Sequence, residues 1–173
     1  MVRKILARGL GPFFPRLRAK LLGVKFGEGC KFNKKVIWGS EPYLISIGNY
    51  FYCSAYVSFI THDGSVNVLR NLSKSYKDCD YFAPILLGHN IFLGYGVVVM
   101  PGSVIGDNVI VGACSLVKGE LASNMVYAGT PAKPICTLEE YENKYGEKLF
   151  KTKGWSADRK KKYLQAIFAR VPS

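Results

Sequence analysis

A six-residue period runs through the middle of the chain and restricts its fold more than any other feature. From Leu87 the residues read LGHNIF, LGYGVV, VMPGSV, IGDNVI and VGACSL. The second position is glycine in four of these five hexads, and the fifth position is small or β-branched in all of them. The first position is aliphatic at Leu87, Leu93, Val99, Ile105, Val111 and Val117. Three positions that stay in register over so many hexads indicate an internal repeat.

A period of six matches neither the α-helical period of about 3.6 nor the irregular spacing of antiparallel strands. It fits short strands stacked in a solenoid, where every sixth side chain points to the axis and Gly, Asn or Asp takes the corners with positive φ. The pairs His89-Asn90 and Asp107-Asn108 fall at such corners. Weaker copies in two other phases are Ile47, Cys53 and Phe59, and Phe26, Phe32 and Trp38. A mainly β solenoid is therefore predicted, with a β-sandwich of coincidental spacing as the alternative.

Three segments lie outside the period. Residues 63–84 are rich in polar side chains, and a loop of this length in a compact domain is usually functional or disordered. Both ends of the chain have helix-like patterns, and Ser156 is the expected N-cap of the last helix. We expect a basic N-terminal segment at 1–25, a solenoid domain at 26–136 that includes loop 63–84, and a helical extension at 137–173.

The net charge of +12 belongs to the ends of the chain. Residues 1–25 contain seven basic and no acidic residues, and residues 144–173 contain nine basic and two acidic residues, so residues 26–143 carry about −2. A strongly basic protein suits nucleic acid, an anionic membrane or a phosphorylated ligand. No nucleic-acid-binding motif is visible, so no nucleic-acid partner is expected. The basic, apolar N-terminus is typical of a peripheral membrane contact, and packing against the solenoid is the equal alternative.

Cysteine usage and the lack of a long apolar run indicate the compartment. Five widely spaced cysteines without a C-x-x-C pair argue against a disulfide framework and a zinc ribbon. No run approaches the ~20 apolar residues of a membrane span, and Pro12, Pro15 and several arginines spoil the N-terminus as a signal peptide. We expect a cytoplasmic protein, at the inner face of the membrane if its ends bind lipid. Cys53 and Cys114 fall within the repeat and are expected in the core.

The chain contains two histidines, His62 and His89. His62 lies where the repeat gives way to loop 63–84, so the solenoid could hold its side chain rigidly beside a cleft. Histidine takes and returns a proton near neutral pH, which makes His62 a candidate base. From the residues alone a structural or surface role is as good an explanation. His89 falls at a corner of the repeat and is expected to be exposed.

The stretch 61–133 resembles the hexapeptide-repeat acyltransferases of the sugar and polysaccharide O-acetyltransferase type. The shared motifs are a histidine before an extended loop and the segments PILLG at 84–88, GACS at 112–115 and GTPAK at 129–133. The resemblance implies a left-handed parallel β-helix with three hexads per coil, an exception to the right-handed crossover rule. It also implies a homotrimer that binds acetyl-CoA between subunits and transfers acetyl to a sugar or glycan of a capsular polysaccharide, a lipopolysaccharide or another surface glycan.

The resemblance assigns roles to single residues. It makes His62 the general base and the backbone N–H of Tyr95 the donor to the oxyanion. The residues it assigns to CoA are Phe92, Ala113, Lys118, Pro131 and Lys133. Lys118 stands one position earlier than the family's lysine, and Phe92 replaces a common tryptophan.

The loop supplies the candidate substrate-binding residues. Arg70 is a candidate for binding an acidic sugar, with a structural arginine as the alternative. Asp63 is a second candidate, and it is also one of the groups that could orient His62. A backbone carbonyl, Asp78 and Asp80 are equally good candidates for orienting the imidazole.

Three other functions are alternatives to sugar O-acetylation. A γ-type carbonic anhydrase uses the same coil but needs three histidine ligands for catalytic zinc, so no metal is expected in a chain with two histidines. An N-acetyltransferase acting on an amino sugar and a non-enzymatic scaffold that binds an anionic surface are the remaining alternatives. The residues leave open which hydroxyl or amine is acylated and whether the acyl group is acetyl.

Overall fold

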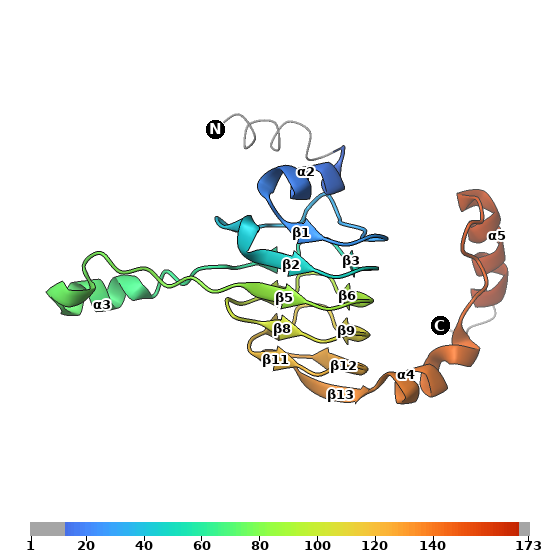
Figure 1. Ribbon diagram of the computed structural model, residues 1–173. Helices are drawn as coiled ribbons and strands as arrows, with labels where there is room; N and C mark the ends of the chain where they lie inside the picture. Colours follow the sequence, from blue (N-terminus) through green and yellow to red (C-terminus); the bar gives the residue numbers. More distant parts are fainter. Residues whose placement is uncertain (1–12, 170–173) are drawn as a thin grey trace. The chain divides into compact units, whose positions relative to one another are not determined.

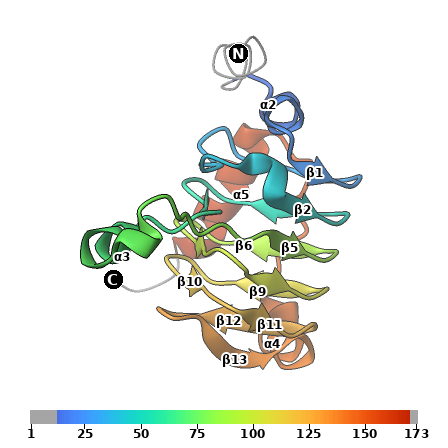
Figure 2. The same ribbon diagram turned by 60° about the vertical axis from the view of Figure 1, so that its left-hand side comes forward.

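The structure is a computed structural model that describes residues 13–169. The chain forms two compact units, Met1–Tyr141 and Glu142–Ser173. The first unit is a parallel β-helix in which successive coils stack along one axis, and their strands form three sheets around that axis, here called faces A, B and C (Figures 1 and 2). Face A contains β1 (Lys25–Phe26), β2 (Ile45–Ile47), β5 (Ile85–Leu87), β8 (Val104–Ile105) and β11 (Glu120–Leu121). Face B contains β3 (Tyr52–Cys53), β6 (Ile91–Leu93), β9 (Val109–Val111), β12 (Met125–Ala128) and the antiparallel β13 (Lys133–Thr137), and face C contains β4 (Ser58–Phe59), β7 (Val98–Val99) and β10 (Leu116–Val117).

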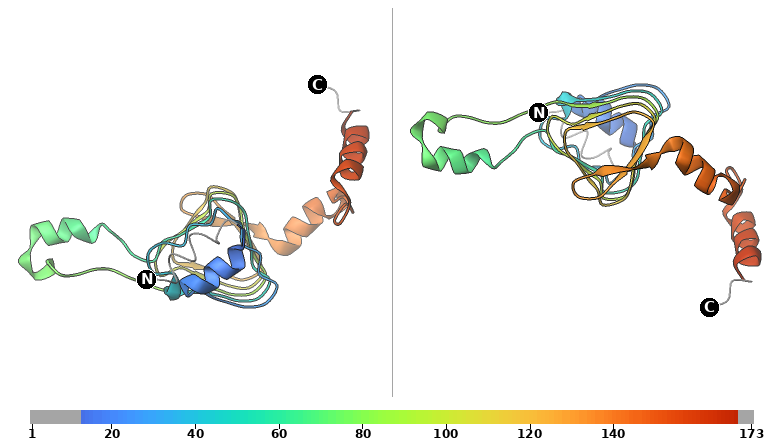
Figure 3. Two further views of the ribbon diagram at one scale, coloured as in Figure 1. Left: turned by 90° about the horizontal axis from the view of Figure 1, so that it is seen from above. Right: turned by 90° about the horizontal axis from the view of Figure 1, so that it is seen from below.

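The hexads of the sequence become the sides of a triangle, as the view along the axis shows (Figure 3). Ile91 pairs with Val109, eighteen residues further along the chain, so one coil takes three hexads. Ile45 pairs with Ile85, forty residues further along, because the 22 residues of loop 63–84 are inserted into that coil. The loop leaves and re-enters the coil without shifting the register of the strands.

All three departures from the eighteen-residue coil lie where face C passes into face A, an edge called here edge CA. In the first coil Lys25 pairs with Ser46, and the three extra residues form the 3₁₀ helix η1 (Pro42–Leu44). Loop 63–84 is the second departure. The third is a shortening by two residues, since Val104 pairs with Glu120. The first two account for the two breaks in phase of the sequence pattern.

The predicted burial of the first hexad position is confirmed, and the structure adds the fifth position to the core. Every aliphatic residue in the first position of the hexads is buried, and so is every residue in the fifth position, including the hydroxyl-bearing Ser103 and Ser115. Ser103 Oγ donates to the Met100 carbonyl and Ser115 Oγ to the Gly112 carbonyl, so these buried hydroxyls are paired.

The glycines in the second position serve close stacking rather than positive φ. A Cβ on Gly94 would lie 2.6 Å from the Ala113 nitrogen of the next coil. The corners with positive φ are taken by other residues, among them Asn90 at 54° and Asn108 at 56°. The expectation that asparagine occupies such corners is confirmed, whereas the repeat glycines have a different role.

The N-terminal end of the coil is filled by aromatic side chains and covered by a helix. Trp38 stacks on Phe59 with ring centroids 5.1 Å apart, and Phe32 meets Trp38 edge to face. Helix α2 (Pro15–Leu22) buries Ala19 against this end. Proline at its first position and Gly23 at its C-cap with φ 92° begin and end the helix.

Loop 63–84 projects from the coil (Figure 3). It contains the short α-helix α3 (Val66–Leu72) and the 3₁₀ helix η2 (Lys74–Tyr76). Its two ends pair with each other: His62 forms an antiparallel bridge with Phe82, and the Ala83 N–H donates to the Thr61 carbonyl. The base of the loop is therefore tied to the coil directly beside His62.

After the coil, helix α4 (Leu138–Tyr145) begins with a capping box in which Thr137 and Glu140 each accept from the other's backbone N–H. The second unit continues with η3 (Gly146–Lys148) and α5 (Ala157–Phe168). Ser156 is the N-cap of α5, as predicted, and accepts from the Arg159 N–H. None of the helices in the described residues 13–169 has the length and apolarity of a membrane-spanning segment.

Candidate active site

Edge CA holds His62 between the end of β4 and the base of the loop. The backbone of His62 is fixed by its bridge to Phe82, and its imidazole lies 6.2 Å from the Phe82 ring. The side chain is 43% exposed. His62 therefore has a fixed backbone and an imidazole that remains accessible, the arrangement that a general base requires.

Glu41 holds the imidazole in place. Its Oε2 lies 3.1 Å from His62 Nδ1 and accepts a second hydrogen bond of 2.9 Å from Thr61 Oγ1. The Glu41 side chain is only 16% exposed, and Thr61 is fully buried. With the hydrogen on Nδ1 donated to the carboxylate, His62 Nε2 is the nitrogen with a free lone pair.

Glu41 was missed by the sequence analysis, which considered Asp63, Asp78, Asp80 and a backbone carbonyl for this role. The three residues of η1 are inserted between Glu41 and His62, so these equivalent positions of two coils are 21 residues apart and not 18. The six-residue period therefore does not align them. Aligning Trp38 with Phe59, which stack on each other, would have placed Glu41 directly opposite His62. Both members of the pair sit at insertions on edge CA.

The edge between faces B and C, called here edge BC, carries Tyr95 and Ala113 one above the other. Each occupies the second position of a tight turn, and the Cys114 N–H donates to the Tyr95 carbonyl at 2.7 Å. Within residues 13–169 neither the Tyr95 N–H nor the Ala113 N–H has a hydrogen-bond acceptor. Edge BC thus offers two backbone donors to a ligand that lies along it.

The other residues assigned to CoA are divided between the two edges. Pro131 lies in the turn between β12 and β13, and Lys133 begins β13, so both lie near the end of edge BC beyond Ala113. Lys118 follows β10 and lies on edge CA, with His62. Phe92 lies on the outer side of face B, where its ring centroid is 5.4 Å from that of Tyr52.

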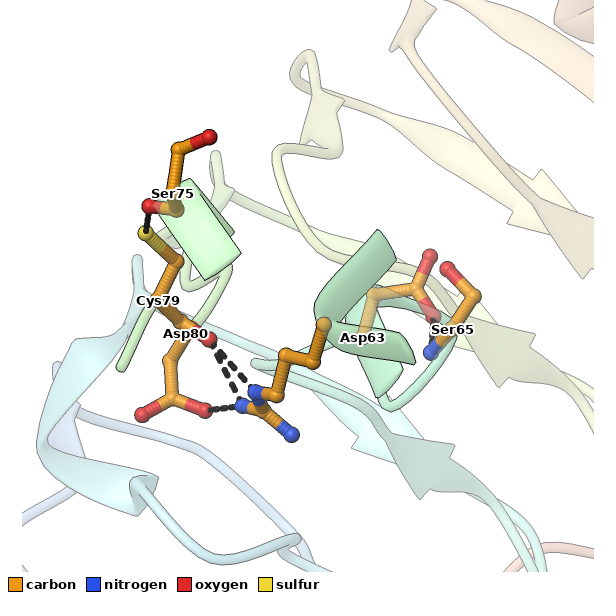
Figure 4. A network of polar contacts seen from close by, with 6 residues as sticks. Asp63, Ser65, Ser75, Cys79 and Asp80 are labelled. Atoms are coloured by element: carbon orange, nitrogen blue, oxygen red, sulfur yellow. Dashed lines mark hydrogen bonds and ion pairs between the residues drawn. The ribbon is translucent and has the colours of Figure 1, made fainter. Parts of the chain in front are cut away.

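The loop residues predicted to bind substrate are engaged within the loop (Figure 4). Arg70 Nε and one of its terminal nitrogens donate to the Cys79 carbonyl at 2.9 and 2.7 Å, and the guanidinium also pairs with Asp80. Asp63 accepts from the Ser65 N–H at 2.8 Å, and this hydrogen bond lowers the pKa of the Asp63 carboxyl, with smaller contributions from Lys118 and His62. Binding of an acidic sugar by Arg70 stays a prediction.

The prediction of a core position was right for one of the two cysteines and wrong for the other. Cys53 is fully buried, and burial raises the pKa of its thiol to about 11, which suppresses the nucleophilic thiolate. Cys114 is exposed at edge BC with φ 57°. It occupies the fourth hexad position, which belongs to the corner rather than to a strand. His89 is exposed as expected, and its Nδ1 accepts from the Asn49 N–H.

His62 and Tyr95 lie at opposite edges of face C. Gly96 bonds to the carbonyl of Ala55, so Ala55 marks the position of Tyr95 in the preceding coil. Seven residues of mostly extended chain run from Ala55 to His62, a separation of roughly 20 Å at ~3.3 Å per residue. One reacting atom of a bound ligand therefore cannot contact both His62 and the Tyr95 N–H of the same chain.

The sequence was compared with known proteins. Residues 84–119 match the family model Bacterial transferase hexapeptide (six repeats). Protein CapG of Staphylococcus aureus is 41% identical over 149 residues, which cover 85% of each chain. The chain belongs to the hexapeptide-repeat acyltransferase family. A second relative in this family, the putative lipopolysaccharide biosynthesis O-acetyl transferase WbbJ of Escherichia coli K12, is 44% identical over 64 residues, 37% of this chain and 32% of WbbJ.

The fold of the hexapeptide-repeat acyltransferases also appears in the comparison with solved structures. A galactoside acetyltransferase in complex with coenzyme A superposes with a TM-score of 0.59 at 24% identity, over 82% of this chain and 84% of the other. The left-handed parallel β-helix that the resemblance predicted is confirmed by this similarity.

Proposed function

We propose that this acyltransferase moves an acetyl group from acetyl-CoA to a sugar hydroxyl, with His62 as the general base. The observation that carries the proposal is the hydrogen bond between His62 Nδ1 and Glu41, because it leaves Nε2 free to accept a proton at the base of loop 63–84. A sugar hydroxyl is a poor nucleophile at neutral pH, and a positioned base contributes about 10²- to 10⁴-fold to such a reaction.

The proposed reaction needs no covalent enzyme intermediate. The hydroxyl oxygen attacks the thioester carbonyl carbon while its proton passes to His62 Nε2. The carbonyl oxygen becomes an oxyanion, which the free N–H of Tyr95 stabilises. The carbon–sulfur bond then breaks, the acetyl ester is released, and the CoA thiolate takes the proton back from His62. The free N–H of Ala113, together with Pro131 and Lys133 further along edge BC, supports this edge as the place for the CoA chain.

We further infer that the active unit is a homotrimer with shared sites. The roughly 20 Å between the two edges of one chain, at ~3.3 Å per residue, prevents His62 and Tyr95 of the same subunit from serving one reaction. A closed ring of identical subunits would bring edge CA of each subunit against edge BC of the next. The site would then combine His62 of one subunit with Tyr95 of its neighbour.

A sugar of a surface glycan is the proposed acceptor, supported by the name of WbbJ, which refers to O-acetyl transfer in lipopolysaccharide biosynthesis. Thiol release from acetyl-CoA in the presence of a panel of sugars tests the activity, and NMR of the product distinguishes an ester from an amide. An amide would favour the N-acetyltransferase alternative. Absence of thiol release with every acceptor, together with retained binding to anionic surfaces, would favour the scaffold.

Replacement of Glu41 by glutamine should lower kcat by about 10- to 100-fold, because a charge-assisted hydrogen bond is worth ~1.5–3 kcal/mol. The amide can still accept from His62 Nδ1 but provides no charge to stabilise the imidazolium. Glu28 provides the matched control Glu28→Gln. It is an exposed carboxylate between faces A and B, and its Oε1 accepts from the Tyr50 hydroxyl. An unchanged kcat for Glu41→Gln would remove Glu41 from the mechanism.

The basic N-terminal segment is the proposed contact with the inner face of the membrane, and its residues 1–12 lie outside the described residues. Phe13 and Phe14 are 78% and 57% exposed and directly precede α2. Arg16 and Lys20 of α2, with Lys25, line a cavity of about 620 Å³. Exposed aromatics beside cations suit an anionic lipid interface. Co-sedimentation with phosphatidylglycerol vesicles should decrease when both phenylalanines are replaced by serine. Equal binding by the wild type and this variant would contradict the membrane contact.

A further inference from the structure

A cluster of one lysine and two tyrosines lies on edge BC toward its N-terminal end. Lys35 Nζ lies 2.6 Å from the Tyr56 hydroxyl and 4.6 Å from the centroid of the Tyr56 ring. The Tyr56 ring meets the Tyr95 ring edge to face, with centroids 5.4 Å apart. The two tyrosines are 43% and 52% exposed. Three successive coils thus present a continuous cationic and aromatic surface.

Two features of this cluster are not explained by stability of the coil. Tyr56 has φ 61°, a conformation that is strained for a bulky side chain, whereas the corresponding corner of the next coil has Gly96 with φ 67°. The ammonium of Lys35 has no carboxylate within 4.0 Å in the part of the chain that the structure describes. The hydrogen bond to Tyr56 raises the pKa of Lys35, so its charge is retained at every physiological pH.

The positions of Lys35 and Tyr56 relative to the Tyr95 N–H indicate that they contact the acceptor and not CoA. In the proposed reaction the thioester carbonyl lies at the Tyr95 N–H, and CoA runs from there past Ala113 toward Lys133. The acceptor must then approach from the opposite side, where Tyr56 and Lys35 lie. His62 belongs to the same coil as Tyr56, so the proposed base and this surface lie at the same height along the axis.

We propose that Lys35, Tyr56 and Tyr95 form the acceptor subsite and that the acceptor is a sugar bearing an anionic group. Aromatic rings offer apolar faces to the C–H groups of a sugar ring, and a lysine ammonium binds a carboxylate or phosphate as a compact charge. This inference rests on the proposed acetyl transfer, because the proposed position of CoA determines from which end of edge BC the acceptor approaches. It goes beyond that function by naming the charge class of the substrate.

The test measures acceptor binding without turnover, by titration of the full-length protein followed by saturation-transfer NMR. The probes are methyl glucuronide and methyl galacturonide, each with its neutral methyl glycoside, and glucose 1-phosphate with glucose. The wild type should bind an anionic probe about tenfold more tightly than its neutral partner, the scale of one charge-assisted hydrogen bond. Preference for the uronides assigns the anion to a carboxylate, and preference for the sugar phosphate assigns it to a phosphate.

Lys35→Gln should abolish this preference, whereas Lys34→Gln, which removes the same charge from the neighbouring exposed position, should retain it. Tyr56→Ala should weaken binding of anionic and neutral sugars alike. Equal affinities for every anionic and neutral pair, or equal losses in the two lysine variants, would overturn the proposal. Because binding is read without acetyl-CoA, this outcome is independent of whether His62→Ala retains acetyl transfer, which tests the proposed function separately.

Discussion

Replacement of His62 by alanine is expected to lower kcat for acetyl transfer by about 10²- to 10⁴-fold, the contribution of a positioned general base. The KM for acetyl-CoA should change little, because the imidazole acts on the acceptor hydroxyl. The physical reason is the free Nε2 lone pair that Glu41 secures by accepting from Nδ1. Thiol release at saturating acetyl-CoA measures the effect.

The chain contains its own control for this experiment. His89, the other histidine, is exposed between faces A and B and contacts the Asn49 N–H, away from edges CA and BC. His89→Ala should therefore retain the wild-type rate. Equal rates for the wild type and His62→Ala would exclude His62 as the base, provided that thermal unfolding shows both proteins to be folded.

Replacement of Tyr95 by proline is expected to lower kcat by about 10²- to 10³-fold, the effect of removing one oxyanion donor. Gly94 to Val97 form a turn closed by a 3.4 Å hydrogen bond from the Val97 N–H to the Gly94 carbonyl. Gly96 at its third position has φ 67° while Tyr95 does not have positive φ, which is the pattern of a type II turn. Proline is favoured at the second position of such turns, so the substitution removes an unpaired N–H and preserves the fold.

Tyr95→Ala separates the backbone from the ring, because it retains the N–H and removes only the side chain. It should keep kcat near the wild-type value and weaken acceptor binding. If proline and alanine lower kcat equally, the N–H of Tyr95 has no role in catalysis. Thermal unfolding of the two variants verifies that the turn tolerates both residues.

Mixing the two inactive variants tests the shared site. A trimer assembled from His62→Ala and Tyr95→Pro subunits contains interfaces where an intact His62 faces an intact Tyr95 N–H. Random co-assembly of a symmetric ring should restore about a quarter of the sites. Absence of recovery in mixed oligomers, or an exclusively monomeric protein, would contradict catalysis between subunits.

The repeat was readable from the sequence because its periodicity is local. Every hexad from Leu87 onward places the same residue types in the same environments, so burial at the first position followed directly, and the structure adds burial at the fifth. The prediction of a core position for Cys114 is wrong because a residue in register with the repeat is not necessarily buried. Only the first and fifth of the six positions are consistently buried, and the fourth lies at the turn between two faces.

The periodicity of the sequence does not reveal the Glu41–His62 pair. The two residues are separated by a whole coil, and the extra turn η1 shifts one relative to the other. A pattern of period six cannot align residues across an insertion that breaks its phase. The contact arises only when the strands stack and Trp38 packs on Phe59.

Features that depend on neighbouring residues can be predicted from this sequence, whereas features that depend on contacts between coils require the tertiary structure. The sequence predicts the solenoid, its buried positions and the point where the loop leaves it. These features depend on a hydrophobic period that is visible in neighbouring residues. The pairing of Glu41 with His62 and the alignment of Tyr95 with Ala55 of the preceding coil depend on stacking of coils at ~4.8 Å per strand. That stacking brings together residues that the chain separates, and it leaves each proposed catalytic group at an edge where a neighbouring subunit would complete the site.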